Sequence, residues 1–224
     1  MSTFKKIFFA FLFIAVSGTS NASIVTVNGD TVSFTYDNVL NGLFGTPTVS
    51  GNSLVFLPTN FKAVSLDGGS TALTSSTFQV KIDRLDGHHI TNIALTEKGD
   101  YLLNGANAKV ADLGELRASD VIFPFQDYVS KIESVNPFAQ TGLASTTNWV
   151  TTANLAFAPN TISSLFVSIE NILFAQSDMK HDIAFIEKKF VGLTVTAVPL
   201  PQALWLFCAG MMGLLSMSKR KKLL

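Results

Sequence analysis

Apolar and polar residues alternate along much of this 224-residue chain, and this period of two constrains its fold more than any other feature. Residues 30–39, with the sequence DTVSFTYDNV, place Val32, Phe34 and Tyr36 at every second position. Successive strand side chains point to opposite faces of a sheet, so the pattern predicts strands with one buried face. Similar runs occupy residues 76–85, 89–97, 107–118, 163–175 and 187–198.

Clusters of Ser, Thr, Asn, Gly and Pro separate these runs and predict turns. Many short strands with such punctuation predict an all-β fold, an antiparallel, jelly-roll-like β-sandwich. The Asp-Gly pair in the sequence DGHH at 86–89 predicts a hairpin between its flanking strands. A final hairpin is expected over 174–190, and residues 139–161 are interpreted as a surface excursion.

Charge is segregated along the chain. All sixteen acidic residues, but only ten of the sixteen basic residues, lie between Ser23 and Val198, so an acidic body has cationic ends. An acidic body argues against nucleic acid as a partner, because phosphate binding needs a basic face. The single cysteine, Cys208, lies outside the body, which therefore cannot form an internal disulfide.

The first residues have the composition of a secretory signal peptide. Basic residues precede an apolar run at 7–16, and small residues follow, with Ser20 and Ala22 at the positions that signal peptidase reads. Cleavage after Ala22 would leave Ser23 first, after export through the Sec machinery. A retained N-terminal anchor is the alternative.

The C-terminal residues combine three features in order: a proline motif, an apolar run and a basic cluster. Prolines restrict both strand and helix, so Pro199 and Pro201 are expected to separate the fold from the tail. Residues 203–217 carry no charge, and a helix of this length spans about 22 Å, short of the roughly 30 Å hydrocarbon core. The positive-inside rule keeps the basic cluster cytoplasmic and places the body outside.

This tail resembles the PEP-CTERM sorting signal of Gram-negative bacteria, in a variant with VPLP in place of the usual motif. Leu200 stands where the namesake motif has glutamate, and Cys208 and Ala209 stand where Gly and Ser are usual. The resemblance covers about 25 residues of the chain. It assigns the sorting motif to Val198, Pro199, Leu200 and Pro201, the transmembrane helix to Ala203, Leu204, Trp205, Leu206, Phe207, Cys208, Ala209, Gly210 and Gly213, and the basic tail to Lys219, Arg220, Lys221 and Lys222.

The resemblance implies processing by exosortase, a membrane-embedded transpeptidase-like enzyme that recognises the tail and cuts it near the proline motif. The body would then be delivered to the envelope surface or the exopolysaccharide matrix. Domain boundaries follow: a signal peptide at 1–22, a sandwich body at 23–197 and a sorting signal at 198–224. An ordinary C-terminal anchor helix is the alternative. Cys208 is interpreted as an apolar filler of the helix, with lipidation or an intermolecular disulfide as alternatives.

Residues able to bind a metal are few in the body. His88 and His89 lie near Asp83 and Asp86 in the sequence, but their spacing matches no metal-binding motif. Adjacent residues of a strand also point to opposite faces, so the two histidines are not expected to bind one metal. The remaining histidine is His181, between two aspartates. Oxygen-rich turns at 83–86 and 97–100 do not follow a calcium-loop pattern. No metal site and no cofactor are therefore predicted.

Carboxylate pairs and aromatic residues were weighed as sugar-processing groups. Glycoside hydrolysis needs two acids at a defined separation, and the candidate pairs are Asp112 with Glu115 and Asp127 with Glu133. Trp149 and Tyr128 are the aromatic residues considered for stacking on a sugar ring. No nucleophile motif accompanies them, so the sequence favours a non-catalytic structural or binding body. A polysaccharide-modifying hydrolase and a carbohydrate-binding module remain the alternatives.

Overall fold

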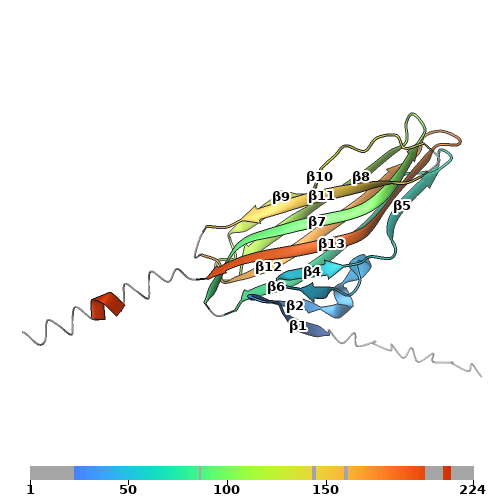
Figure 1. The fold of residues 1–224 in the computed structure, drawn as a ribbon. Coiled ribbons are helices and arrows are strands. Elements are labelled where there is room, and N and C mark those ends of the chain that lie inside the picture. Colours follow the sequence, from blue (N-terminus) through green and yellow to red (C-terminus); the bar gives the residue numbers. More distant parts are fainter. Residues whose placement is uncertain (1–22, 86, 143–144, 159–160, 200–208, 213–224) are drawn as a thin grey trace, which may run out of the picture.

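The protein folds into a β-sandwich. The computed structural model describes residues 23–85, 87–142, 145–158, 161–199 and 209–212. Their strands form two antiparallel sheets that pack face to face (Figure 1). Two short 3-10 turns, η1 (Asn38–Leu40) and η2 (Gly42–Phe44), interrupt the strands. The all-β sandwich predicted from the alternation is therefore confirmed.

One sheet has six strands in the order β1-β2-β6-β12-β8-β9. Its two longest strands lie side by side in its middle, and each pairs along most of its length. The strands are β1 (Ile24–Asn28), β2 (Val32–Asp37), β6 (Ala72–Arg84), β12 (Ser164–Gln176), β8 (Lys109–Asp120) and β9 (Asp127–Lys131).

The other sheet has seven strands, in the order β10-β11-β7-β13-β4-β3, with β5 pairing β13 beside β4. Its centre is the pair β7 and β13, each 17 residues long. The strands are β10 (Glu133–Ser134), β11 (Thr147–Ala156), β7 (His88–Asn104), β13 (Ile183–Pro199), β4 (Ser53–Phe56), β3 (Thr48–Ser50) and β5 (Phe61–Leu66).

The core between the sheets is rich in phenylalanine. Phe56 and Phe78, from opposite sheets, meet edge to face with their centroids 4.7 Å apart. Phe44 contacts both of these rings and also Phe61. Each of the four rings is at most 1% exposed, so aromatic packing joins β4, β5, β6 and the η2 turn. In the described part of the chain no cysteine contributes to this core.

The expected hairpin at the Asp-Gly pair is wrong. Gly87 has the positive φ of a turn, +77°, but the strands on its two sides belong to different sheets. β6 pairs with β2 and β12, whereas β7 pairs with β11 and β13. The turn therefore carries the chain across the sandwich. The final hairpin is wrong for the same reason, because β12 and β13 also lie in different sheets.

The described part of residues 139–161 is not the expected surface excursion. They include β11, which pairs with β7 over ten residues. Its inward positions, among them Trp149, Thr151 and Leu155, are buried. The Ser- and Thr-rich composition of this segment reflects its loops and outward positions, while its alternating apolar residues contribute to the core.

Strand β13 continues into the proposed sorting motif. Val198 and Pro199 pair with His89 and His88 of β7, so the first proline does not separate the fold from the tail. Within the described residues this end of β13 pairs only with β7, and a proline is tolerated where its missing N–H faces an unpaired edge. Nor does the sandwich end at residue 197, since its last strand continues to Pro199.

The two helices expected at the chain ends cannot be compared in full. Residues 7–16 lie outside the described residues, as do 203–208 and 213–217. Residues 209–212 are helical and exposed. No helix in the described part of the chain is long and apolar enough to cross a membrane.

Candidate functional site

A groove of about 590 Å³ lies on the outer face of the six-stranded sheet. Cross-strand pairing builds its floor from two rows of outward side chains. One row runs Thr35, Lys81, Phe166, Ser119 and Asp127 across five strands, as the strand registers give it. Neighbouring strands are about 4.8 Å apart, so this row extends about 19 Å. The second row holds Gln79, Ser168, Arg117 and Val129.

The groove combines one exposed aromatic ring with positively and negatively charged side chains. Phe166 stands in the middle of the first row and is 53% exposed, although phenylalanine is usually buried. Lys81 beside it pairs with Asp83 at 2.8 Å, and Arg117 pairs with Glu115. These pairs lie within single strands on the outer face. The Lys81 ammonium and the Arg117 guanidinium are each partly exposed, so their remaining N–H groups are open to a ligand.

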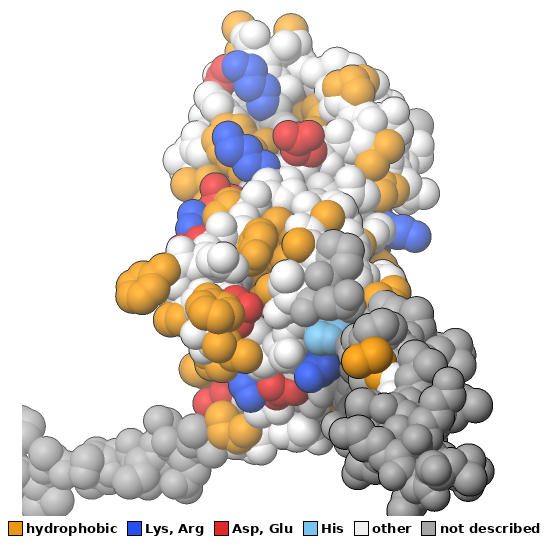
Figure 2. Space-filling view, turned by 90° about the vertical axis from the view of Figure 1, so that its left-hand side faces the viewer, with side chains coloured by type: hydrophobic (Ala, Val, Ile, Leu, Met, Phe, Trp, Pro, Cys, Tyr) orange, Lys and Arg blue, Asp and Glu red, His pale blue; other side chains and the backbone are white. Residues whose placement is uncertain are grey.

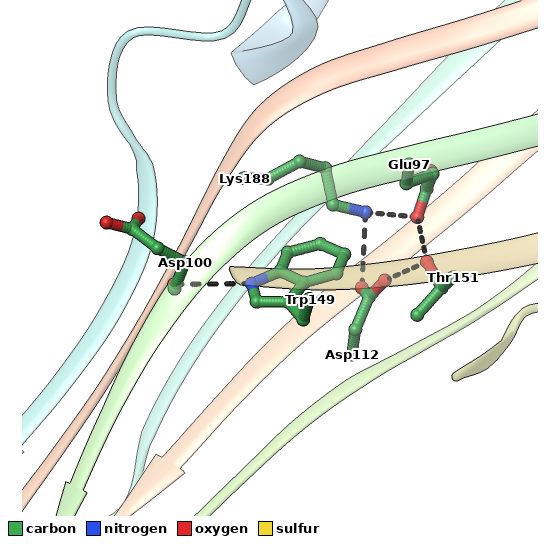
Figure 3. Close-up of polar contacts among 6 residues, drawn as sticks. All are labelled: Glu97, Asp100, Asp112, Trp149, Thr151 and Lys188. Carbon is green, nitrogen blue, oxygen red and sulfur yellow. Dashed lines mark hydrogen bonds and ion pairs between the residues drawn. The ribbon is translucent and has the colours of Figure 1, made fainter. Parts of the chain in front are cut away.

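A second arrangement of polar groups lies inside the sandwich, where Lys188 of β13 meets two carboxylates (Figure 3). Its Nζ lies 2.5 Å from Glu97 Oε2 of β7 and 3.1 Å from Asp112 Oδ1 of β8. Thr151 Oγ1 of β11 is 2.8 Å from Asp112 Oδ2 and 3.3 Å from Glu97 Oε2. The side chains of Lys188, Glu97 and Asp112 are inaccessible to solvent. We call these four residues the buried cluster.

Aromatic rings enclose the ammonium of the buried cluster. Lys188 Nζ lies 5.4 Å from the ring centroid of Phe61 and 5.7 Å from that of Trp149, within the range of cation–π attraction. Trp149 is fixed by its indole N–H, which donates to the Asp100 carbonyl. Its ring also lies close against Gly99, where a Cβ would come 2.7 Å from the indole. The same Cβ would overlap the backbone carbonyl oxygen of Glu187 on β13, so glycine at 99 accommodates both the paired strand and the indole.

A β-bulge lies in β13 directly after Lys188. The inward positions before it are Ala184 and Ile186, and Lys188 continues that alternation. Lys189 is the extra residue of the bulge, and its ammonium lies 2.9 Å from Asp100 Oδ2. After the bulge, the buried positions shift by one, beginning at Val191. Bulges of this kind redirect side chains next to functional sites.

Burial raises the pKa of the Glu97 carboxyl from 4.5 to about 7. Loss of hydration is the largest cause, because it disfavours the charged form. Lys188 opposes the rise and the Asp112 carboxylate adds to it. Glu97 Oε1 has no hydrogen-bond partner among the described residues. One buried cation faces two carboxyl groups, so a proton on Glu97 makes the cluster neutral near pH 7.

The histidines do not assemble into a metal site. No group of His, Cys, Asp and Glu side chains within the described ranges could hold a metal ion. His89 is buried, with Nε2 3.4 Å from an Arg84 nitrogen. His181 is an exposed residue with φ +71°, at the end opposite His88 and His89. Asp83 accepts from Lys81 and Ser164 instead of forming a calcium loop; Asp86 lies outside the described residues.

The carboxylate pairs considered from the sequence do not form acid pairs. Asp112 points into the core, whereas Glu115, on the outer face of the same strand, pairs with Arg117. Asp127 belongs to the six-stranded sheet and Glu133 to the other.

Neither aromatic candidate for sugar stacking is fully exposed. Trp149 is 4% exposed and belongs to the core. Tyr128 is half-buried, with its ring edge to face against Phe157 at 4.8 Å. The exposed aromatic face of the groove is Phe166, which the sequence did not distinguish from the other phenylalanines.

Lys188 and Glu97 were not singled out from the sequence as a pair. A signal was present, since each falls at an inward position of an alternating run. A charged residue at such a position indicates a buried ion pair, because a lone charge is too costly to bury.

A separate surface feature lies at the end of the sandwich where β13 finishes. Figure 2 views this end and shows hydrophobic side chains standing out from the surface. At this end the loop between β8 and β9 exposes Ile122, Phe123 and Phe125, the last 99% exposed.

Of the proposed sorting residues, only a few fall within the described ranges. Val198 and Pro199 end β13, and Ala209 and Gly210 lie in the short helix at 209–212. Ser23 is the first described residue, and its N–H donates to Asp37 Oδ1 at 3.1 Å. The others lie outside: Ala22, Leu200, Pro201, Ala203, Leu204, Trp205, Leu206, Phe207, Cys208, Gly213, Lys219, Arg220, Lys221 and Lys222.

Comparison with protein-family models finds none that matches this chain, and no curated protein matches it.

Proposed function

We propose that this chain is an exported envelope or matrix protein, sorted by exosortase, whose non-catalytic, jelly-roll-like body binds exopolysaccharide. The sorting part rests on the three-part tail and on the signal-peptide composition of the first residues. The binding part rests on the groove of the six-stranded sheet. In this proposal the membrane is a transient partner, contacted by the tail before processing.

The observation that carries the binding proposal is the position of Phe166 in the groove. Sugars present apolar C–H faces and rims of hydroxyl groups, so they suit an aromatic ring surrounded by hydrogen-bonding side chains. Phe166 has Lys81 and Ser119 as its two cross-strand neighbours. A row about 19 Å long suits a polymer better than a single sugar. Among the residues that line the groove, Arg117 can donate hydrogen bonds to sugar hydroxyl groups and the Asp127 carboxylate can accept them.

Titration of the host's matrix polysaccharide into the purified protein tests this proposal. The wild type is expected to bind, and Phe166→Ala is expected to weaken binding several-fold by removing the stacking face. Phe125→Ala is the matched control, because it removes an exposed phenylalanine that does not line the groove. Equal affinity of wild type and Phe166→Ala would contradict the groove as the binding site. Release of shorter glycans during incubation would favour the hydrolase alternative.

Mass spectrometry of the C-terminus tests the sorting proposal separately. In cells with exosortase, the mature protein is expected to lack Lys219, Arg220, Lys221 and Lys222. In cells without the enzyme these residues should remain. A tail that is intact in both strains, or lost equally from both, would contradict sorting by exosortase.

A further inference from the structure

We propose that Lys188 and Asp112 form an intramolecular isopeptide bond, with Glu97 as the proton-transfer group. This inference goes beyond the proposed function and does not depend on it. It arises from the buried cluster, in which an amine and a carboxyl group from different sheets meet in a site closed to water. The bond would join β13 of the seven-stranded sheet to β8 of the six-stranded sheet.

The geometry brings the reacting groups together before any chemistry occurs. Lys188 Nζ is 3.1 Å from Asp112 Oδ1, which places the nitrogen beside the carboxyl group whose Cγ it would attack. Thr151 donates toward Asp112 Oδ2 at 2.8 Å and fixes the plane of the carboxyl group. Two aromatic rings hold the ammonium in place. Such fixed placement corresponds to effective concentrations of roughly 10⁵–10⁸ M, which makes amide formation feasible without an activated carboxyl group.

The protons of the cluster balance the reaction. With Glu97 protonated, the starting groups are an ammonium, a carboxylate on Asp112 and a neutral carboxyl group. Lys188 passes one proton to Asp112, and its neutral amine attacks Cγ of that residue. Glu97 then gives its proton to the departing hydroxyl and takes one from the nitrogen. The C–O bond breaks, the C–N bond forms and one water leaves, with Glu97 again protonated. No oxidant, reductant or cofactor is consumed.

Asp112 is the expected acceptor, although Glu97 lies nearer to the amine. Burial raises the pKa of Glu97, so this group can carry the proton that the reaction needs. After Lys188 has reacted with Asp112, the remaining acid, Glu97, is stable in the core as a neutral carboxyl group. The bond also removes a buried ammonium and a buried carboxylate, whose dehydration is costly.

Peptide mapping of the wild-type protein, purified from the host as full-length or naturally processed chain, tests this proposal directly. Trypsin cuts after free lysine and arginine but not after an amidated lysine. A bond should therefore yield a branched peptide of residues 110–117 and 181–189. Its mass should be lower by one water than the sum of its two parts. Separate linear peptides of full mass, with cleavage after Lys188, would overturn the proposal.

The branch point also tests the assignment of the acceptor. Glu97 lies in the tryptic peptide 85–98, and a branch to that peptide would overturn Asp112 as the acceptor. Asn171, a buried amide with no hydrogen-bond partner among the described residues, lies in peptide 132–180. A branch to it, formed with loss of ammonia, would overturn the assignment in the same way.

Two variants complete the test. Lys188→Arg keeps the cation but has no reactive amine, so the branched peptide should disappear. Glu97→Gln keeps the shape but cannot shuttle a proton, so the bond should form in a much smaller fraction of molecules. Full bond formation in Glu97→Gln would contradict the role of Glu97. Because the wild-type map decides whether the bond exists, poor folding of either variant does not leave the proposal untested.

Discussion

Replacement of Glu97 by glutamine separates two physical descriptions of the buried cluster, because they predict opposite changes in stability. Without an isopeptide bond, Glu97→Gln removes a carboxylate from a site where burial raises its pKa to about 7. Above that pH the charged form costs the folded state about 3 kcal/mol relative to an ordinary glutamate of pKa 4.5. Lys188 and Asp112 would remain as a buried ion pair with no net charge. The variant should then equal or exceed the wild type in stability at pH 8.

With the bond, the same substitution prevents loop closure. Lys188 and Asp112 are 76 residues apart, and a cross-link that closes a loop of that length lowers the entropy of the unfolded chain. The stabilisation estimated for such a loop is about 4–5 kcal/mol. For a domain of this size each kcal/mol corresponds to about 2–4 °C in Tm. Glu97→Gln is therefore expected to lower Tm by roughly 10–20 °C.

Thermal unfolding at pH 8, followed by near-UV circular dichroism, measures this difference. Glu115→Gln is the matched control, because Glu115 lies on the outer face and pairs with Arg117 at the surface. Exposed pairs of this kind contribute about 0–1 kcal/mol, so the control should melt within a few degrees of the wild type. A Glu97→Gln protein that melts at or above the wild-type temperature would refute the cross-linked description.

Three further outcomes are expected. Gly99→Ala should destabilise the fold by about 3 kcal/mol, since its Cβ would overlap the backbone carbonyl oxygen of Glu187 and lie 2.7 Å from the Trp149 ring; urea unfolding measures the loss. Phe78→Ala should cost about 3–5 kcal/mol, and a loss below 1 kcal/mol would contradict its central place in the core. In Lys188→Arg, the unfolding free energy should fall as the pH rises from 4.5 to about 7 and then level off. The reason is that Glu97 keeps its proton to a higher pH in the folded protein than in the unfolded chain. A rise over that range in urea melts would contradict the raised pKa.

The strands could be predicted because alternation is a local property of the sequence. Residues 76–85 and 163–175 read as strands and, except for Leu85 and Ser163, lie in β6 and β12, as predicted. The pairing of strands could not be predicted, because it depends on contacts far apart in the chain. At Gly87 the sequence correctly indicates a turn with positive φ. The same turn serves a hairpin or a crossing between sheets, and only the packing of long β7 against β11 and β13 decides which.

The candidate sites show the same division between local and distant information. Alternation alone places Lys188 on the inward face of its strand, and Glu97 on the inward face of another. Their meeting depends on the register of β13 with β7 and on the stacking of the two sheets. Phe166 has an ordinary strand sequence around it. Its role in the groove follows only from its neighbours on β6 and β8.

The position of the buried cluster suggests how a cross-link would serve this protein if it is exported as proposed. The body has no cysteine, so a disulfide cannot join its sheets. β13 is the last strand and leads into the tail that exosortase is proposed to cut. A pull on the C-terminal end would therefore load β13 first, and its hydrogen bonds with β7 could open one after another from Pro199 inward. A bond at Lys188 would stop that opening at the bulge. It would leave Ile183–Lys188 and the phenylalanine-rich core intact, because the load would pass across the sandwich into β8.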